Sequence, residues 1–119
     1  MDSRWDPAWQ AANPAIVEII RNRRNVGGYD EARMIGARRQ LEARAAHDTF
    51  ARLPALPMPT LVCAGRYDAV APLANAEALA AQIPRATLRV FDGGHAFFLQ
   101  DPSAWSAIVA FLAASQPST

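Results

Sequence analysis

The chain has 119 residues, of which 51% are hydrophobic, and a formal net charge of +1, as expected for a single folded domain. The basic residues are arginines, without any lysine, and acidic residues accompany them through the first half of the chain. This mixed charge gives no basic patch of the kind that binds nucleic acid. No apolar run reaches the ~20 residues of a membrane span, the polar N-terminus does not resemble a signal peptide, and the single cysteine allows no internal disulfide. We therefore expect a soluble, cytoplasmic protein that binds neither membranes nor nucleic acid.

The first half of the sequence predicts helices. Asn13 and Pro14 form a helix start, and three isoleucines give this helix an apolar face to about Arg24. Asp30 can cap a second helix with an apolar stripe, which consists of Met34, Ala37, Leu41 and Ala45. Asp48 can cap a short continuation, in which Phe50 and Leu53 are expected to face inward. The proline-rich run 54–59 then ends the helical half and predicts a connector.

The second half predicts alternating strands and helices. The apolar run TLVCA at 60–64 is typical of a strand buried on both faces, and TLRVF at 87–91 alternates like a strand near a sheet edge. Pro72 starts a helix between them that Pro84 ends. Asp101 and Pro102 start a last helix with a regular stripe of Trp105, Ile108, Val109 and Leu112. Connections this short predict a β-α-β unit of parallel strands followed by a covering helix, and therefore an α/β fold.

Two polar residues follow these strands and are expected to meet. Asp68 lies in the loop after the first strand, and His95 lies after Gly93 and Gly94 in the loop after the second. Parallel strands end at the same edge of a sheet, and neighbours are only ~5 Å apart. A carboxylate beside an imidazole fixes its tautomer and stabilises the imidazolium, which makes the histidine an oriented general base.

These motifs resemble the α/β-hydrolases. The run PTLVCAGRYDAVAP is similar to the penultimate strand and acid loop of that fold, and ATLRVFDGGHAFFLQDPSAW is similar to its last strand, histidine loop and final helix. The resemblance is specific over residues 59–114. Residues 1–58 resemble the last helices of a cap and a connector in lactonase- and esterase-like members. The resemblance to this family implies that residues 59–119 are the C-terminal βαβα portion of the hydrolase core, with two parallel strands, and that cap-like helices precede it.

The resemblance also implies roles for individual residues. Asp68 matches the triad acid and His95 the triad base, in the family's order. None of the serines lies in a Gly-x-Ser-x-Gly nucleophile elbow, and the oxyanion-hole motif is also missing from the sequence. We therefore expect ester- or lactone-type hydrolysis of a small molecule only when an upstream half is supplied, and an inactive chain alone. No cofactor or metal is expected.

These residues also allow other interpretations. Taken singly, His95 and Asp68 could each be an ordinary turn residue. Their pairing favours descent from the histidine and the acid of a catalytic triad. Cys63 is expected to point into the core rather than act as a nucleophile, and His47 has no second ligand at metal spacing. A substrate pocket is assigned more weakly to Val70, Phe97, Trp5 and Trp9.

A second hypothesis for the whole chain is a non-catalytic binding or assembly module. Two strands cannot satisfy their own edges or cover both faces of the sheet. On this hypothesis the chain forms a homo-oligomer through its exposed sheet edge and its helical arm.

Overall fold

The computed structural model describes residues 4–24 and 30–114. In chain order the helices and strands are α1 (Pro7–Ala12), α2 (Pro14–Arg24), α3 (Glu31–Ala45), the 3-10 helix η1 (Phe50–Ala55), β1 (Thr60–Gly65), α4 (Leu73–Gln82), β2 (Ala86–Phe91), α5 (Phe97–Gln100) and α6 (Ser103–Ala114). No helix in these described ranges is long and apolar enough to cross a membrane.

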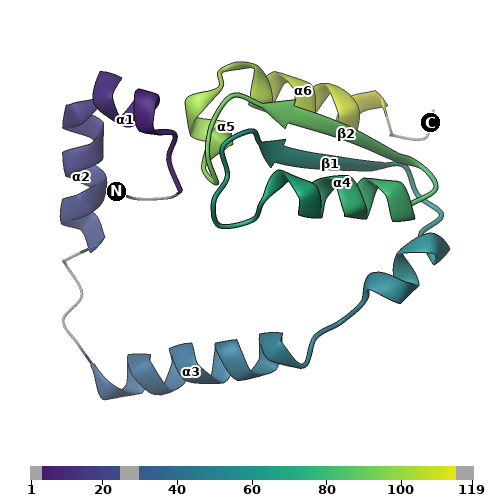
Figure 1. Cartoon of the computed structure of the whole chain (residues 1–119), viewed down its shortest axis with the longest axis horizontal. Coiled ribbons are helices and arrows are strands. Elements are labelled where there is room, and N and C mark those ends of the chain that lie inside the picture. Colours follow the sequence, from purple (N-terminus) through teal and green to yellow (C-terminus); the bar gives the residue numbers. More distant parts are fainter. Residues whose placement is uncertain (1–3, 25–29, 115–119) are drawn as a thin grey trace.

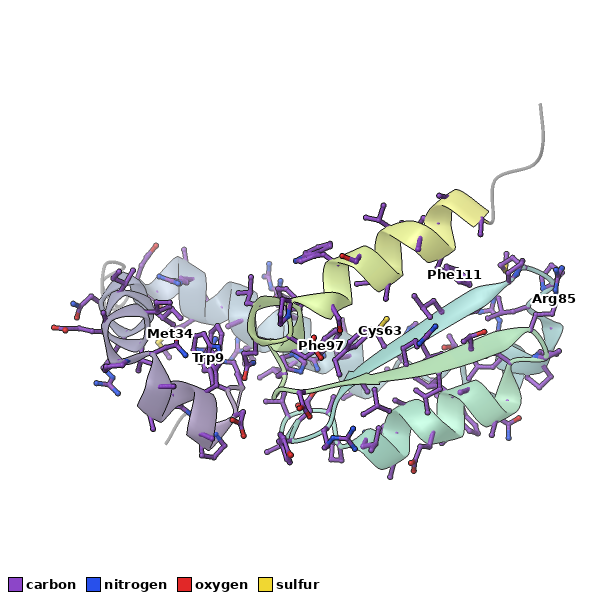
Figure 2. All side chains as sticks on the ribbon, turned by 90° about the horizontal axis from the view of Figure 1, so that it is seen from above. Trp9, Met34, Cys63, Arg85, Phe97 and Phe111 are labelled. Atoms are coloured by element: carbon purple, nitrogen blue, oxygen red, sulfur yellow. The ribbon has the colours of Figure 1, made fainter. Side chains whose placement is uncertain are left out.

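The sheet consists of β1 and β2, which pair in parallel with Thr60 opposite Ala86 and Gly65 opposite Phe91. Helix α4 connects the two strands and packs on one face, while α6 lies over the other (Figures 1 and 2). The expected β-α-β unit and parallel strands are confirmed. The strands end on the side of the molecule where α5 and the N-terminal segment lie (Figure 1).

The apolar faces of the sheet and of α6 are less buried than the sequence predicted. The first four residues of β1 are only half-buried, because a cavity of about 360 Å³ separates this strand from α6. On α6 the fully buried residue is Ala104, whereas most of the predicted stripe is exposed: Trp105 at 56%, Val109 at 60% and Leu112 at 56%. Ile108 of the stripe and Phe111, which the stripe did not include, line the cavity between α6 and β1. The prediction of a strand buried on both faces was therefore wrong for β1.

The N-terminal half forms the predicted helices, and it also contains α1, which the sequence reading missed. Asp6 caps α1 by accepting the Trp9 N–H at 2.7 Å, and Asp30 caps α3 by accepting the Ala32 N–H. Every residue of α3 is exposed, including Leu41 of the predicted stripe. Phe50 is 43% exposed instead of facing inward. These apolar side chains face solvent.

The chain exposes much more surface than a compact protein of its mass. Its accessible surface is 8955 Å² and its mass 12.9 kDa, whereas a compact monomer of that mass exposes about 6,300 Å². Its radius of gyration is 17.5 Å, against about 13.5 Å for a compact domain of this length. The difference in area, roughly 2,600 Å², has the size of a large protein interface.

Candidate functional site

The structure brings Asp68 and His95 together at the carboxyl edge of the sheet. The Nδ1 atom of His95 lies 2.9 Å from Oδ2 of Asp68. The Asp68 side chain is only 6% exposed, while that of His95 is 48% exposed. The pair therefore has a buried carboxylate behind an imidazole whose other side is open to solvent.

The Asp68 carboxylate is held by its own loop. Its Oδ1 atom accepts the N–H groups of Val70 at 2.8 Å and of Ala71 at 2.9 Å. Burial acts to raise the pKa of Asp68, but the hydrogen bonds from Ala71, His95 and Val70 outweigh it and hold the pKa below its ordinary value. Asp68 is therefore an anion at neutral pH, and these hydrogen bonds fix the conformation of its side chain.

Close backbone contact between the two loops makes this pairing possible. The Tyr67 N–H donates to the Gly93 carbonyl at 2.9 Å, and the Arg66 N–H donates to the Phe91 carbonyl at 2.9 Å. Gly65 lies directly against the histidine loop, since a Cβ placed on it would be 2.1 Å from the carbonyl oxygen of Gly94. A side chain at this position would push the loop that carries Asp68 away from the loop that carries His95.

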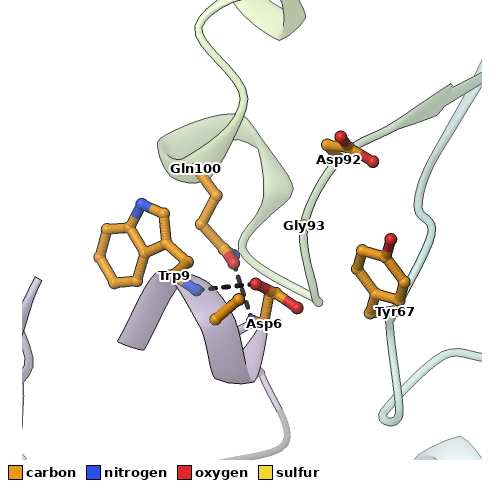
Figure 3. Close-up of a pocket in the computed structure, with 7 residues that line it drawn as sticks. Asp6, Trp9, Tyr67, Asp92, Gly93 and Gln100 are labelled. Carbon is orange, nitrogen blue, oxygen red and sulfur yellow. Dashed lines mark hydrogen bonds between the residues drawn. The ribbon is translucent and has the colours of Figure 1, made fainter. Parts of the chain in front are cut away.

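A cavity of about 310 Å³ lies beside the histidine loop (Figure 3). Its lining comes from the N-terminal segment, from both sheet loops and from α5: Asp6, Ala8, Trp9, Tyr67, Asp92, Gly93 and Gln100. Asp92 also pairs with Arg66 at 3.2 Å. The walls therefore combine an indole, a phenol, two carboxylates and an amide.

The four residues assigned to a pocket from the sequence are found in different places. Trp9 lines the cavity, and Trp5 stacks behind it with ring centroids 5.0 Å apart. Val70 is 52% exposed, and Phe97 stacks on Phe91 at 5.2 Å; neither lines this cavity. Their roles in substrate binding stay predictions.

Sequence reasoning missed four polar members of the lining, which are Asp6, Tyr67, Asp92 and Gln100. Tyr67 adjoins Asp68 in the GRYD motif, which was a usable signal. Asp6 and Gln100 meet across 94 residues of sequence, and no local pattern reports such a contact.

Two other reactive side chains lie in different surroundings. Cys63 lines the apolar cavity between β1 and α6, and burial raises the pKa of its thiol. His47 is exposed just beyond the end of α3. Within residues 4–24 and 30–114, no group of three or more His, Cys, Asp or Glu side chains could hold a metal ion.

Comparison with known proteins gives this geometry a family context. The sequence matches the alpha/beta hydrolase fold family over residues 9–102. It is 46% identical over 74 residues to the polyketide synthase ThaQ of Burkholderia thailandensis, covering 60% of this chain and 4% of that protein. It is 36% identical over 72 residues to the putative carbamate hydrolase RutD of Stutzerimonas stutzeri, covering 60% of this chain and 27% of that protein.

A solved structure is similar over nearly the whole chain. MGS-M2, an alpha/beta hydrolase enzyme from a Medee basin deep-sea metagenome library, superposes with a TM-score of 0.76 at 20% identity. The match covers 98% of this chain and 43% of that one, so this chain spans less than half the length of each of these relatives. The family match and the shared fold agree with the parallel sheet described above. The chain belongs to the α/β-hydrolase fold family.

Proposed function

We propose that this chain supplies the acid and histidine of an α/β-hydrolase active site. The observation that carries the proposal is the 2.9 Å contact between His95 Nδ1 and Asp68 Oδ2 at the carboxyl edge of the parallel strands. Asp68 is the orienting acid in this scheme, and His95 is the general base. The division of the chain into a cap-like segment, 1–58, and a core portion, 59–119, belongs to the same proposal.

The geometry supports a defined path for the proton. A hydrogen bond from His95 Nδ1 to the Asp68 carboxylate favours the tautomer in which Nε2 carries the lone pair. Nε2 would take the proton of an attacking hydroxyl as its oxygen bonds to a substrate carbonyl, and would return that proton to the leaving group. The Asp68 anion stabilises the imidazolium formed between these steps, and its lowered pKa keeps it ionised throughout.

The nucleophile and the oxyanion donors in this proposal come from a polypeptide that covers the exposed surface. The Ser103 hydroxyl is already committed, because it donates to Asp101 Oδ1 at 2.6 Å, and Cys63 lies in the apolar cavity under α6. Oxyanion donors typically contribute ~10²–10³-fold to the rate of acyl transfer. The chain alone is therefore proposed to be inactive.

The proposed substrate is a small molecule with a hydrolysable carbonyl group, such as an ester or lactone. Similarity to the putative carbamate hydrolase RutD supports a carbonyl substrate, and similarity to the polyketide synthase ThaQ supports an acyl context. No cofactor is needed for this chemistry, since the proton is carried by His95 alone.

The acid–histidine pair can be tested without a nucleophile. Diethyl pyrocarbonate acylates neutral imidazole nitrogen, and His47 provides an internal reference because it is exposed and pairs with no carboxylate among the described residues, unlike His95. Asp68→Asn is expected to slow acylation of His95 at pH 9, well above the ordinary histidine pKa of about 6.5, because the amide polarises the neutral imidazole less than the carboxylate does. Asp92→Asn, a change at an exposed carboxylate paired with Arg66, should leave the rate unchanged. Equal His95 rates in wild type and Asp68→Asn would overturn the proposed pairing.

Turnover of p-nitrophenyl acetate tests whether the chain is inactive alone. The purified chain should match the Asp68→Ala, His95→Ala double variant at background. Turnover well above background that the double variant loses would mean that another group is the nucleophile, and Cys63→Ser would then show whether the thiol is responsible.

A second candidate function is self-assembly, and the excess of exposed surface favours it. The N–H groups of Thr60 and Arg66 donate to carbonyls at the β2 side, so alternation along the strand directs the N–H groups of Leu61 and Cys63 to the opposite edge. Light scattering after size exclusion would report an oligomer if copies pair along this edge. Leu61→Pro removes one outward N–H without touching the β1–β2 ladder, and it should shift such an oligomer to monomer; a monomeric wild type would exclude this candidate.

A further inference from the structure

The residues on both sides of His95 are held by hydrogen bonds from their backbone N–H groups. The Gly94 N–H donates to Oε1 of Gln100 at 3.3 Å, and the Ala96 N–H donates to the Arg4 carbonyl at 2.9 Å. The same Gln100 oxygen accepts the Asp6 N–H at 2.8 Å (Figure 3). Gln100 therefore joins the N-terminal segment to the histidine loop, and we call Arg4, Asp6 and Gln100 the clamp.

The orientation of the Gln100 amide is fixed by its neighbours. Two N–H groups converge on Oε1, and reversing the amide would set its NH₂ group against both donors. The Nε2 atom is buried and has no hydrogen-bond partner among the described residues. The side chain keeps this arrangement although one donor is left unsatisfied, which indicates that its oxygen supplies the important contacts.

The N-terminal segment lies directly on the histidine loop. A Cβ on Gly94 would be 2.7 Å from the Arg4 carbonyl oxygen and 3.0 Å from the backbone carbon of Trp5. Trp5 is only 8% exposed, and Gln10 donates from its side chain to the Trp5 carbonyl at 3.0 Å. The segment is therefore packed in place, with no room for a side chain between it and the loop.

The His95 ring itself has little packing to orient it. Its side chain is 48% exposed, and the contact with Asp68 joins one ring nitrogen to one carboxylate oxygen. Which rotamers are open to such a ring depends on its backbone φ and ψ, so its approach to Asp68 depends on how that backbone is held. The bonds to Gly94 and Ala96 hold that backbone on both sides.

We propose that Gln100 is a positioning residue, through which the docked N-terminal segment holds the His95 backbone where its ring meets Asp68. This inference deepens the proposed function, since the orientation of His95 has a catalytic consequence only if His95 is the general base. It links the cap-like segment to the histidine: release of residues 4–6 would remove the bond from Ala96 to Arg4 and the bond from Asp6 to Gln100, and would loosen the Asp68–His95 contact.

The test uses ¹⁵N NMR of the histidine rings in the full chain, with His47→Gln as the background to assign His95. In this background we expect one dominant His95 tautomer, protonated at Nδ1. Gln100→Met keeps the length of the side chain but removes the acceptor. It should move both His95 ring shifts toward those of free imidazole and speed exchange of the Gly94 amide, which loses its acceptor, roughly fivefold, as expected for one lost hydrogen bond. Gln100→Glu restores an acceptor oxygen and should restore the ring shifts.

Gln82→Met is the matched control, since Gln82 is an exposed residue at the end of α4. A folded Gln100→Met variant with unchanged His95 ring shifts would overturn the proposal. If that variant fails to fold, Asp6→Pro and Asp6→Ala replace it. Both lose the cap carboxylate of α1, but only proline also lacks the N–H bonded to Gln100, and the Asp6 φ of −58° suits proline. Equal ring shifts in these two variants would likewise overturn it.

The readout is independent of the hydrolase proposal. Ring tautomer and amide exchange are measured without turnover, so a chain that never hydrolyses an ester can still show the clamp. If Asp68→Asn leaves His95 unperturbed while Gln100→Met shifts it, the acid–histidine proposal fails and the clamp stands.

Discussion

Replacing Gly65 with alanine should disturb the molecule more than any comparable change of one methyl group. Gly65 ends β1, and a Cβ on it would lie 2.1 Å from the Gly94 carbonyl oxygen, 2.7 Å from that of Gly93 and 2.9 Å from the Gly94 carbonyl carbon. All three are backbone atoms, so no side chain can rotate away to make room. The strand end and the histidine loop must move apart.

The expected cost follows from that geometry. Overpacking of a core by a methylene group typically costs ~1–3 kcal/mol. We expect a value of about 3 kcal/mol for Gly65→Ala, because the overlap involves a rigid loop on each side. In a domain of this size the thermal midpoint should fall by roughly 10 °C or more.

Thermal and urea unfolding followed by circular dichroism would measure this cost. Gly36→Ala is the matched control, since a Cβ there has nothing within 4 Å and the residue lies inside α3. That change should raise the stability of the helix by about 0.5–1 kcal/mol. If Gly65→Ala unfolds within about 0.5 kcal/mol of wild type, a typical change at an unconstrained site, the close contact between the two loops is wrong.

Two further predictions concern titration. The pKa of Asp68 is lower in the folded state than its ordinary value of 3.8. The carboxylate therefore adds stability that is fully present above pH 3.8 and is lost as the pH falls through the lower folded value. Asp68→Asn should reduce the free energy of unfolding at pH 7 and make it less dependent on pH below about 4. Urea unfolding at a series of pH values from 2 to 7 measures this, and the same pH dependence of the unfolding free energy in both proteins would contradict the prediction. Burial raises the pKa of Cys63, so its thiol should react with Ellman's reagent at pH 8 at least roughly tenfold slower in the folded chain than in urea; equal rates would show that the cavity beside β1 does not shield it.

The sequence was a good guide where structure depends on local pattern. The alternation in TLRVF, the prolines that flank α4 and the cap at Asp101 were enough to locate the β-α-β unit and α6. The meeting of Asp68 with His95 followed from topology, since parallel strands end at one edge of the sheet.

The sequence was a poor guide where structure depends on distant neighbours. An apolar stripe predicts a buried face only if another element covers it, and Leu41 lies 64% exposed, while Trp105 stays 56% exposed although Phe98 of α5 meets its ring edge-on. The short helix α5 and the contact of Gln100 with Asp6 were missed because they depend on docking of the N-terminal segment. The cavity beside the histidine loop depends on the same docking.

The sequence distance spanned by the Gln100–Asp6 contact has a consequence for the order of folding. Pairing of β1 with β2 closes a short loop, since Thr60 lies opposite Ala86, whereas the contact of Asp6 with Gln100 joins residues 94 positions apart. Loop-closure entropy makes the longer closure less favourable by about 1 kcal/mol. The sheet, with Asp68 and His95 on its loops, should therefore form early and the N-terminal segment should dock late. A refolding chain would pass through a state with native strands and a histidine still free to turn.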